Sequence, residues 1–381
     1  MATQWRLSAL ADRHRALGSN LEDWNGMGTA WTYPDSQYSL ADMHEAIRTR
    51  AGLMDVSGLR KVHYVGPHAE PLLENATTRD ISKIYPGKSV YATMLNEHGK
   101  LVDDCVIYRT APNAFMVVHG AAAGLEMLTR ESQGRQVEVL FDDDLHDLSL
   151  QGPTAVDFLE EHVPGIRDLP YFHHMQTRLF GCPVMISRTG YTGERGYEIF
   201  CKAIDTHTIW DTILEQGKPH GIIPCAFVIL DWLRVESQLL FYPFDMSEAY
   251  PVGDEPHGDS LWELGLDFTV SKTKDPLDFR GGLEHMRLKG QERFRIFGVL
   301  IEGDQSAGEG DEVWADGKKV GVITCAMYSR LTNRSMALAR LDVPYAEHGK
   351  SLEVRGSLNA TASSHTLPFD DPEKKKRTAK G

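Results

Sequence analysis

The sequence contains few cysteines and no long apolar run. Its 381 residues include five cysteines, none of them in a C-x-x-C spacing. An odd, scattered set argues against a disulfide framework and a cysteine zinc site, and fits a reducing compartment. No stretch reaches the ~18 apolar residues of a membrane span, and the N-terminus lacks the apolar core of a signal peptide. We therefore expect a cytoplasmic protein without a membrane span.

Positive charge is also in short supply. The chain has 40 Lys and Arg against 54 Asp and Glu, a formal net charge of -14 at pH 7. Such a surface repels phosphate backbones and anionic lipid, so we expect neither nucleic acid nor a membrane as partner. The exception is the tail DPEKKKRTAKG, residues 371–381. We expect this basic run to be solvated, and a contact with a polyanion stays open.

Several common catalytic motifs are missing. The sequence has neither a G-x-x-x-x-G-K-[ST] phosphate loop nor a G-x-S-x-G nucleophile elbow. The glycine-rich run at 190–196 lacks the dinucleotide-binding spacing and precedes the strand-like YEIF instead of a helix. His173 and His174 have no Cys or carboxylate at metal-ligand spacing, so we expect no metal site.

The patterns that are present mix helix and strand without regular alternation. Residues 153–163 and 206–217 have helical spacing, and 101–108 and 115–118 are strand-like. After Phe294 short β-runs follow, with Asp316-Gly317 as a hairpin signal. We therefore expect an α+β core over 1–285 with two lobes and a break near 145, a β domain over 286–368, and a basic tail over 369–381. Residues 247–261 are expected to form a long loop.

Two adjacent carboxylates give the first chemical signal. A strand from Tyr91 leads into an Asn-Glu-His-Gly turn, and the returning strand contains Asp103 and Asp104. Because neighbouring strand residues face opposite sides, one should face inward and the other solvent. A carboxylate in a sheet-lined cavity is costly unless a ligand or partner satisfies it. A surface turn with two solvated acids explains the same pattern.

Two further patterns follow. Glu198 opens a strand after the glycine-containing loop at 189–196. Its carboxylate can accept paired N–H donors from a heterocycle, or it can face water from an edge strand. The segment LSLQGP at 148–153 predicts a strand that turns into a helix.

In this order and spacing, the patterns resemble the glycine-cleavage T-protein (aminomethyltransferase) family, which includes tetrahydrofolate-dependent demethylases. The resemblance covers nearly the whole chain. The matching segments are MDVS at 54–57, residues 91–104, LQGP at 150–153, GYTGE-x-G-x-E at 190–198, LRVE at 233–236, GVITCAMYS at 321–329, MALARL at 336–341 and LPF at 367–369. The resemblance implies a folate-binding core, a C-terminal β-barrel-like domain and tetrahydrofolate as cofactor.

The resemblance also implies roles for individual residues. Asp104 matches the acidic residue beside the reactive N5 of the folate, so it is the candidate catalytic residue. Glu198 matches the carboxylate that binds the amino edge of the pterin. The other candidate folate-binding residues are Tyr91, Val106, Tyr108 and Tyr191.

The chain departs from the family pattern at positions that face folate or substrate. Gly58 replaces the histidine that follows MDVS, Leu230 replaces an arginine that meets the folate, and Gly120 replaces an asparagine. Because Asp104 and Glu198 are kept, we interpret these changes as retained pterin binding with an altered substrate pocket.

Aromatic residues suggest where a substrate could bind. Trp24, Trp31 and Tyr33 lie within ten residues, and Trp232 replaces a small residue of the family motif. Aromatic faces can hold a methylated cation or stack on an aromatic ether, and aromatic residues are equally common in cores. We take these four as candidate substrate residues.

The resemblance and these residues predict a tetrahydrofolate-dependent methyltransferase that acts as a demethylase. It would move a methyl group from a small sulfonium, betaine, methylamine or methoxyaryl compound to N5. One alternative is an aminomethyltransferase served by a lipoyl carrier protein, a partner that we do not expect because such carriers are usually acidic. The other is a non-catalytic folate-binding assembly factor, whose signature cysteine is missing from 189–194.

Overall fold

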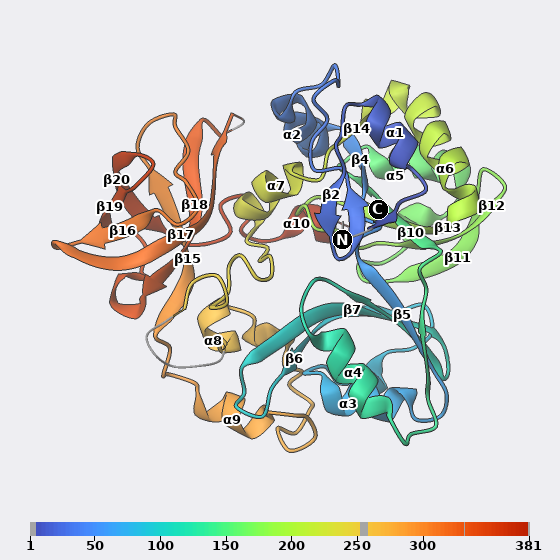
Figure 1. Cartoon of the computed structure of the whole chain (residues 1–381), viewed down its shortest axis with the longest axis horizontal. Coiled ribbons are helices and arrows are strands. Elements are labelled where there is room, and N and C mark those ends of the chain that lie inside the picture. Colours follow the sequence, from blue (N-terminus) through green and yellow to red (C-terminus); the bar gives the residue numbers. More distant parts are fainter. Residues whose placement is uncertain (1–4, 252–257, 331, 380–381) are drawn as a thin grey trace.

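Three parts make up the structure: two lobes, each built on a β-sheet, and a β-barrel (Figure 1). The computed structural model describes residues 5–251, 258–330 and 332–379. In that part of the chain, no helix has the length and apolar character needed to span a bilayer. The predicted α+β fold with a C-terminal barrel is confirmed.

The first lobe is a five-stranded sheet with helices on one face. The strand order is β6-β7-β8-β5-β9. The strands are β5 (Arg60–Val65), β6 (Ser89–Leu95), β7 (Leu101–Ala111), β8 (Ala114–His119) and β9 (Glu138–Phe141). Helices α3 (Ala69–Ala76) and α4 (Gly124–Ser132) share a core with the sheet. Because side chains alternate along β7, Cys105 and Ile107 join this core, while Asp104 lies on the opposite face.

The second lobe is a six-stranded sheet in the order β11-β12-β13-β10-β4-β14. Its strands are β4 (Ala51–Asp55), β10 (Leu145–Gln151), β11 (His174–Leu179), β12 (Cys182–Ser187), β13 (Gly196–Lys202) and β14 (Ile222–Pro224). Its helices are α1 (Ala11–Ala16), α2 (Leu40–Thr49), α5 (Ala155–His162), α6 (Ala203–Gln216) and α7 (Ile229–Ser237). A small sheet of β1 (Arg6–Leu7), β3 (Met27–Thr29) and β2 (Glu22–Trp24) lies at the N-terminal end. The proposed break near residue 145 coincides with the start of β10, but the N-terminal segment through β4 belongs to this second lobe as well.

The two sheets meet face to face through a small apolar cluster. Tyr108 and Val118 of the first sheet pack there with Met185 and Phe200 of the second. Since Phe200 and Glu198 lie on the same face of β13, Glu198 also points toward this interface. Asp104 of the first lobe and Glu198 of the second therefore both lie on sheet faces that point toward the interface between the lobes.

The C-terminal part is a closed barrel in the order β15-β18-β17-β16-β19-β20. Its strands are β15 (Phe294–Ile301), β16 (Glu312–Ala315), β17 (Lys318–Ser329), β18 (Arg334–Asp342), β19 (Ser351–Arg355) and β20 (Asn359–His365). The predicted hairpin at Asp316-Gly317 is confirmed, with positive φ angles of 50° and 75° that suit a tight two-residue turn. Val235 of α7 packs with Met327 and Leu338 of the barrel, which attaches the barrel to the core.

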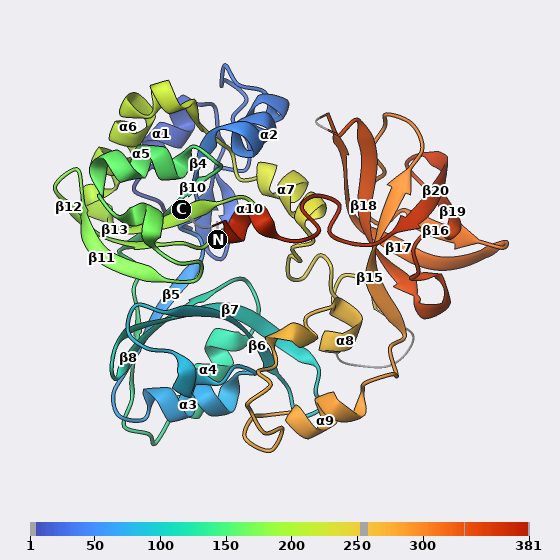
Figure 2. The same ribbon diagram turned by 180° about the vertical axis from the view of Figure 1, so that it is seen from behind.

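Two segments lie outside these three parts. The first is the predicted loop, which lies partly outside the described residues, and the second is the tail, which differs from the expectation. Six residues of the predicted loop, 252–257, lie outside the described residues, and the chain continues through α8 (Leu261–Leu264) and α9 (Gly282–Arg287). The tail was expected to be solvated, but it forms α10 (Lys375–Thr378) and returns to the core (Figure 2). The reason is electrostatic, because the Lys376 Nζ lies 3.2 Å from Glu194 and 2.7 Å from Asp370.

Candidate active site

Asp104 lies on the face of β7 that points away from the helices, next to Tyr91 of β6. The register pairs Tyr91 with Val106, and the Tyr91 hydroxyl donates a hydrogen bond of 2.6 Å to Asp104 Oδ2. Burial, and then the nearby Asp103, raise the pKa of the Asp104 carboxyl to about 6, although the Tyr91 hydrogen bond acts in the other direction. A carboxylate with this pKa can take up a proton near neutral pH.

Asp103 does not face solvent, so the expected inward and outward split of the two aspartates is wrong. It is 1% exposed. Its Oδ2 accepts a hydrogen bond of 3.0 Å from the Gly124 backbone N–H at the start of α4 and lies 3.3 Å from His119 Nδ1. Helices cover this face of the sheet, so both faces of β7 are inside the protein. Asp103 therefore attaches α4 to the sheet.

Glu198 is connected to the Asp104 strand by a tyrosine. The Tyr108 hydroxyl, two residues beyond Val106 on the same face of β7, donates to Glu198 Oε2 at 3.2 Å. The Thr189 hydroxyl donates to the same oxygen. Burial raises the pKa of the Glu198 carboxyl, and these two hydrogen bonds lower it. Both hydrogen bonds use Oε2, which leaves Oε1 for another donor.

A second buried carboxyl near Glu198 was missed by the sequence analysis. Asp147 of β10 is fully buried, and neither of its carboxyl oxygens has a hydrogen-bond partner in the described residues. Burial, followed by the charge of Glu198, raises its pKa well above the usual range. The charge of the buried Lys61 interacts with the Asp147 carboxyl, and burial lowers the pKa of Lys61 to about 8. One feature of the sequence could have indicated this carboxyl, because Asp147 is a charged residue inside the strand that leads to LQGP at 150–153.

Tyr191 lies where the core, the linker and the barrel meet. Its hydroxyl donates to the backbone carbonyl of Leu240. Nearby, Arg234 of α7 forms an ion pair of 2.6 Å with Asp245, and Thr324 of the barrel donates to the same aspartate. Burial raises the pKa of the Tyr191 phenol, and the charge of Asp104 contributes to that rise.

The four candidate substrate residues belong to one apolar cluster, but they do not all share ring contacts. Trp24 and Trp31 both pack on Phe227, with ring centroids 4.5 and 4.8 Å away. Tyr33 is a buried member of the same cluster, with its hydroxyl 2.9 Å from His14 Nδ1. Trp232 packs edge-on against His44. The structure therefore gathers all four in one cluster, where Trp24 and Trp31 share Phe227 and the other two residues have histidine neighbours.

The three departures from the family pattern have structural correlates. A Cβ at Gly58 would lie 2.4 Å from Trp24 Cε3, so the indole occupies the space of the missing histidine. Leu230 is buried in the apolar cluster that includes Phe227. Gly120 has open space around its Cα, with no heavy atom within 4 Å of an added Cβ. The first change is therefore coupled to Trp24, and the third opens room beside β8.

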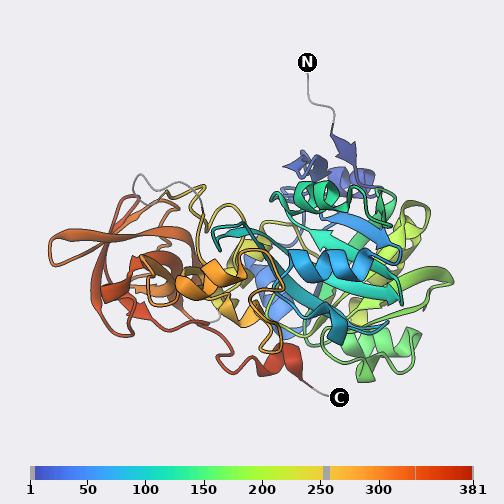
Figure 3. The same cartoon turned by 90° about the horizontal axis from the view of Figure 1, so that it is seen from below.

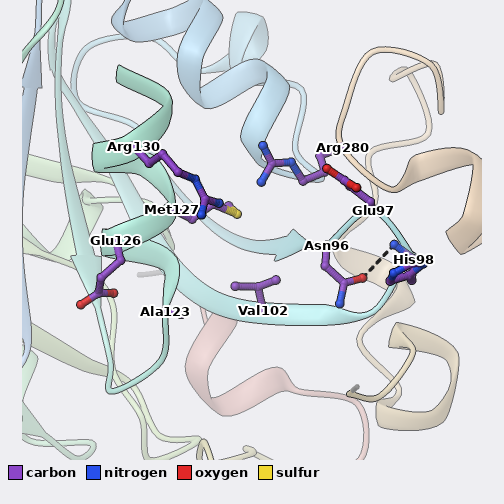
Figure 4. Close-up of a pocket in the computed structure, with 9 residues that line it drawn as sticks. All are labelled: Asn96, Glu97, His98, Val102, Ala123, Glu126, Met127, Arg130 and Arg280. Carbon is purple, nitrogen blue, oxygen red and sulfur yellow. Dashed lines mark hydrogen bonds between the residues drawn. The ribbon is translucent and has the colours of Figure 1, made fainter. Parts of the chain in front are cut away.

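Two hollows at the surface are distinct from these carboxyl groups. Figure 4 shows the first, where Arg130 of α4 and Arg280 reach in from opposite sides. The residues lining it are Asn96, Glu97, His98, Val102, Ala123, Glu126, Met127, Arg130 and Arg280. The second contains Arg48, Glu194 and Lys376. Neither is lined by Asp104 or Glu198, so the candidate site rests on buried polar groups and not on these hollows.

Comparison with known families decides the assignment of the fold. Residues 10–274 match the family model described as the GCVT N-terminal domain, and residues 295–370 match the glycine cleavage T-protein C-terminal barrel domain. The chain belongs to the glycine cleavage T-protein family. The resemblance noted from the sequence motifs is confirmed.

Individual relatives differ in the activities that their names state. The chain is 74% identical, over the full length of both proteins, to the heme-dependent oxidative N-demethylase gamma subunit of Ectopseudomonas mendocina. It is 31% identical to the trimethylamine-oxide aldolase of Ruegeria pomeroyi, over 95% of this chain and 47% of that protein. It is 29% identical to an aminomethyltransferase of Halalkalibacterium halodurans, over 92% and 94% of the two chains. These names place the chain in a family of enzymes.

A solved structure supports the fold alone. The glycine cleavage system aminomethyltransferase T of Bartonella henselae superposes with a TM-score of 0.85 at 22% identity, covering 96% of this chain and 98% of that one.

Proposed function

We propose that this chain binds tetrahydrofolate and transfers to it the one-carbon unit removed from an N-methyl compound. The observation that carries the proposal is the Asp104 carboxyl, which Tyr91 holds at 2.6 Å and whose pKa is raised to about 6. The 74% identity to a subunit of an N-demethylase supports the substrate class. That relative is a subunit, so we also propose that this chain works with partner chains.

The carboxyl groups between the sheets suit the ring of a folate. Glu198 Oε1 can accept from the amino group and ring N–H of a pteridine, because the two hydrogen bonds to this residue occupy Oε2. Asp147 has both oxygens without a partner, and a buried polar group of this kind is costly until a ligand or water satisfies it. Tyr108 keeps Glu198 on the same side of β7 as Asp104.

Asp104 would act on the proton that leaves the folate nitrogen. When bound, the folate supplies a nucleophilic N5 that takes the carbon. The ionised Asp104 accepts the proton, and Tyr91 orients the carboxylate and keeps its pKa from rising further. We take Val106, which lies on the same face of β7, and Tyr191 as lining residues of this space.

Two versions of this function are possible, and they differ in the oxidation state of the transferred carbon. If a partner chain oxidises the N-methyl group, the carbon leaves as formaldehyde, which condenses with N5 and N10 of tetrahydrofolate, releases water and yields 5,10-methylenetetrahydrofolate. Direct methyl transfer to N5, expected from the sequence, is the second version. It would use aromatic faces that attract a methylated cation, and the partly exposed Trp24 and Trp31 beside Phe227 are the candidates for this role.

A labelling experiment tests the proposal. The full chain is incubated with tetrahydrofolate and either ¹³C-formaldehyde or ¹³C-methyl donors, namely a sulfonium, a betaine, a methylamine and a methoxyaryl compound. The first version predicts 5,10-methylenetetrahydrofolate from formaldehyde, faster than in a reaction without protein. The second predicts 5-methyltetrahydrofolate from one of the donors. Neither product above the protein-free background would reject the proposal.

A further inference from the structure

An exposed apolar strand forms one edge of the first sheet. In the sheet order, β9 has a neighbour on one side only, β5, and its Leu140 and Phe141 side chains are 52% and 46% exposed. The Arg6 guanidinium of β1 lies 5.3 Å from the centre of the Phe141 ring, which places the exposed Leu7 of β1 beside this edge. Figure 3 shows β1 at the outside of the molecule, on the side opposite α10. Neighbouring exposed apolar side chains are typical of a surface that another chain covers.

The backbone of β9 also has free hydrogen-bonding groups along its outer side. The Asp142 N–H donates to the carbonyl oxygen of Lys61 at 2.9 Å, at the end of the regular pairing of β9 with β5. Because the backbone groups of successive residues in an antiparallel strand point to alternate sides, the N–H and C=O groups of Val139 and Phe141 point away from β5. Among the described residues, these groups have no hydrogen-bond partner. Such an edge is a template for a further strand.

The charges around β9 indicate what the further strand contains. Acidic residues lie at both ends of the apolar residues, Glu138 before them and 142–144 after them. Arg6 and Lys202 pair with the acids at 142–144, whereas Glu138 forms no ion pair within the described residues. A strand with apolar side chains at its centre and Lys or Arg opposite Glu138 therefore complements this edge.

A second copy of this chain does not complement the edge. A two-fold antiparallel pairing centred on Leu140 would put Glu138 of each copy opposite Asp142 of the other. Like charges directly opposite in a sheet are destabilising, and each copy has a net charge of -14. The edge therefore suits a different chain.

We propose that β9 docks a partner chain by strand addition, in which an extended segment that is apolar at its centre and has Lys or Arg opposite Glu138 pairs with the free edge. Leu140, Phe141 and the neighbouring Leu7 then pack against its side chains. The inference rests on the proposed function, in which this chain works with partner chains. The added strand extends the five-stranded sheet that contains Asp104, so it joins the partner to the lobe of the candidate catalytic residue.

Complex formation and hydrogen exchange test the docking edge. The probe is the set of other subunits of the Ectopseudomonas mendocina N-demethylase, because its gamma subunit is 74% identical to this chain. The full chain should bind them, and exchange of the Val139 and Phe141 amides should slow by about ten-fold or more, since the added strand supplies their hydrogen-bond acceptors. Sedimentation of the chain alone should show a monomer. A dimer that protects the same two amides would assign the edge to a second copy and overturn the proposal.

Variants separate the side chains of the edge from its backbone. Leu140→Lys should weaken the complex by about ten-fold or more, because it removes an apolar contact and adds a charge. Leu283→Lys on α9 is the matched control, since Leu283 is 47% exposed in another part of the surface, and it should leave the affinity unchanged. Phe141→Ala and Phe141→Pro both remove the ring, but only proline also removes the outward N–H. The proline variant should therefore bind about five-fold more weakly than the alanine variant.

The outcomes distinguish the docking edge from the proposed function. Wild-type affinity in Leu140→Lys, equal weakening by Leu283→Lys, or unchanged exchange of the two amides in the complex would overturn the docking edge and leave the partner chains in place. No complex with the wild-type chain would reject the partner chains of the proposed function, and the docking edge with them.

Discussion

Two partly buried aspartates, Asp55 and Asp104, differ in how far the protein satisfies them. Asp55 lies 2.9 Å from His14 Nε2 and accepts hydrogen bonds from Ser8 and Ser57. Burial raises its pKa, but the hydrogen bonds and the charge of His14 outweigh burial, so the pKa lies below the usual range. Among the described residues, Asp104 has one side-chain hydrogen-bond partner, Tyr91, and burial raises its pKa. The first aspartate has partners for both of its oxygens, and the second has a hydrogen bond on one oxygen.

The same difference between the two regions distinguishes Tyr33 from Tyr91, two aromatic residues whose surroundings the sequence did not reveal. Tyr33 belongs to the Asp55 region, because its hydroxyl contacts the imidazole that faces Asp55. Tyr91 belongs to the Asp104 region. Both hydroxyls make a hydrogen bond, Tyr33 to His14 and Tyr91 to Asp104, so the difference lies in what surrounds each tyrosine and not in residue type.

The largest expected effect is on catalysis at Asp104. Asp104→Asn should lower the rate of one-carbon transfer by about 100-fold or more, because the amide cannot accept the proton. Stopped-flow or end-point assays of the folate product measure it. The same substitution should raise the melting temperature at pH 7, since a carboxyl with a raised pKa destabilises the folded state once it ionises. A variant with nearly wild-type rate would remove Asp104 from the mechanism.

The matching change in the other region should act on stability alone. Asp55→Ala should cost about 3 kcal/mol or more of unfolding free energy, because it leaves His14 and two serines without their partner. The lowered pKa means that this stabilisation is present at neutral pH and is lost as pH falls through the acidic range. Denaturant titration measures the loss. A reduced rate in the folded fraction would contradict the separation of the two regions.

The pH dependence gives a smaller and more specific effect. The transfer rate should fall as pH decreases through about 6, the range in which Asp104 becomes protonated. Because the Tyr91 hydrogen bond lowers this pKa, Tyr91→Phe should move the midpoint of the profile to higher pH. Rates of both proteins from pH 5 to 8 test it. A midpoint that stays in place, or moves to lower pH, would mean that Tyr91 does not set the charge of Asp104.

Local patterns in the sequence were sufficient for the fold class and for several elements. The Asp316-Gly317 hairpin depends on two residues that tolerate positive φ, and the strand at 101–108 depends on its own side chains. Both are determined by neighbours in the chain. The ordered motifs then supplied the family and its candidate carboxylates.

What could not be predicted depends on contacts between distant segments. Strand alternation placed Asp103 opposite Asp104, but only the packing of α4 on the sheet determines that Asp103 is buried. The Asp147 carboxyl is unusual because of what surrounds it, and no local pattern records that. The tail is basic in the sequence, yet its position depends on Glu194, almost two hundred residues earlier.

Calorimetry with tetrahydrofolate tests the central claim most directly, because it asks whether the carboxyl groups between the two sheets form a folate site. The wild-type chain should bind, and Glu198→Gln should weaken binding by about ten-fold or more, since a hydrogen bond to a charged group contributes about 1.5–3 kcal/mol. Asp104→Asn should bind with nearly wild-type affinity. No heat of binding in the wild-type chain, or equal affinity in Glu198→Gln, would contradict the account.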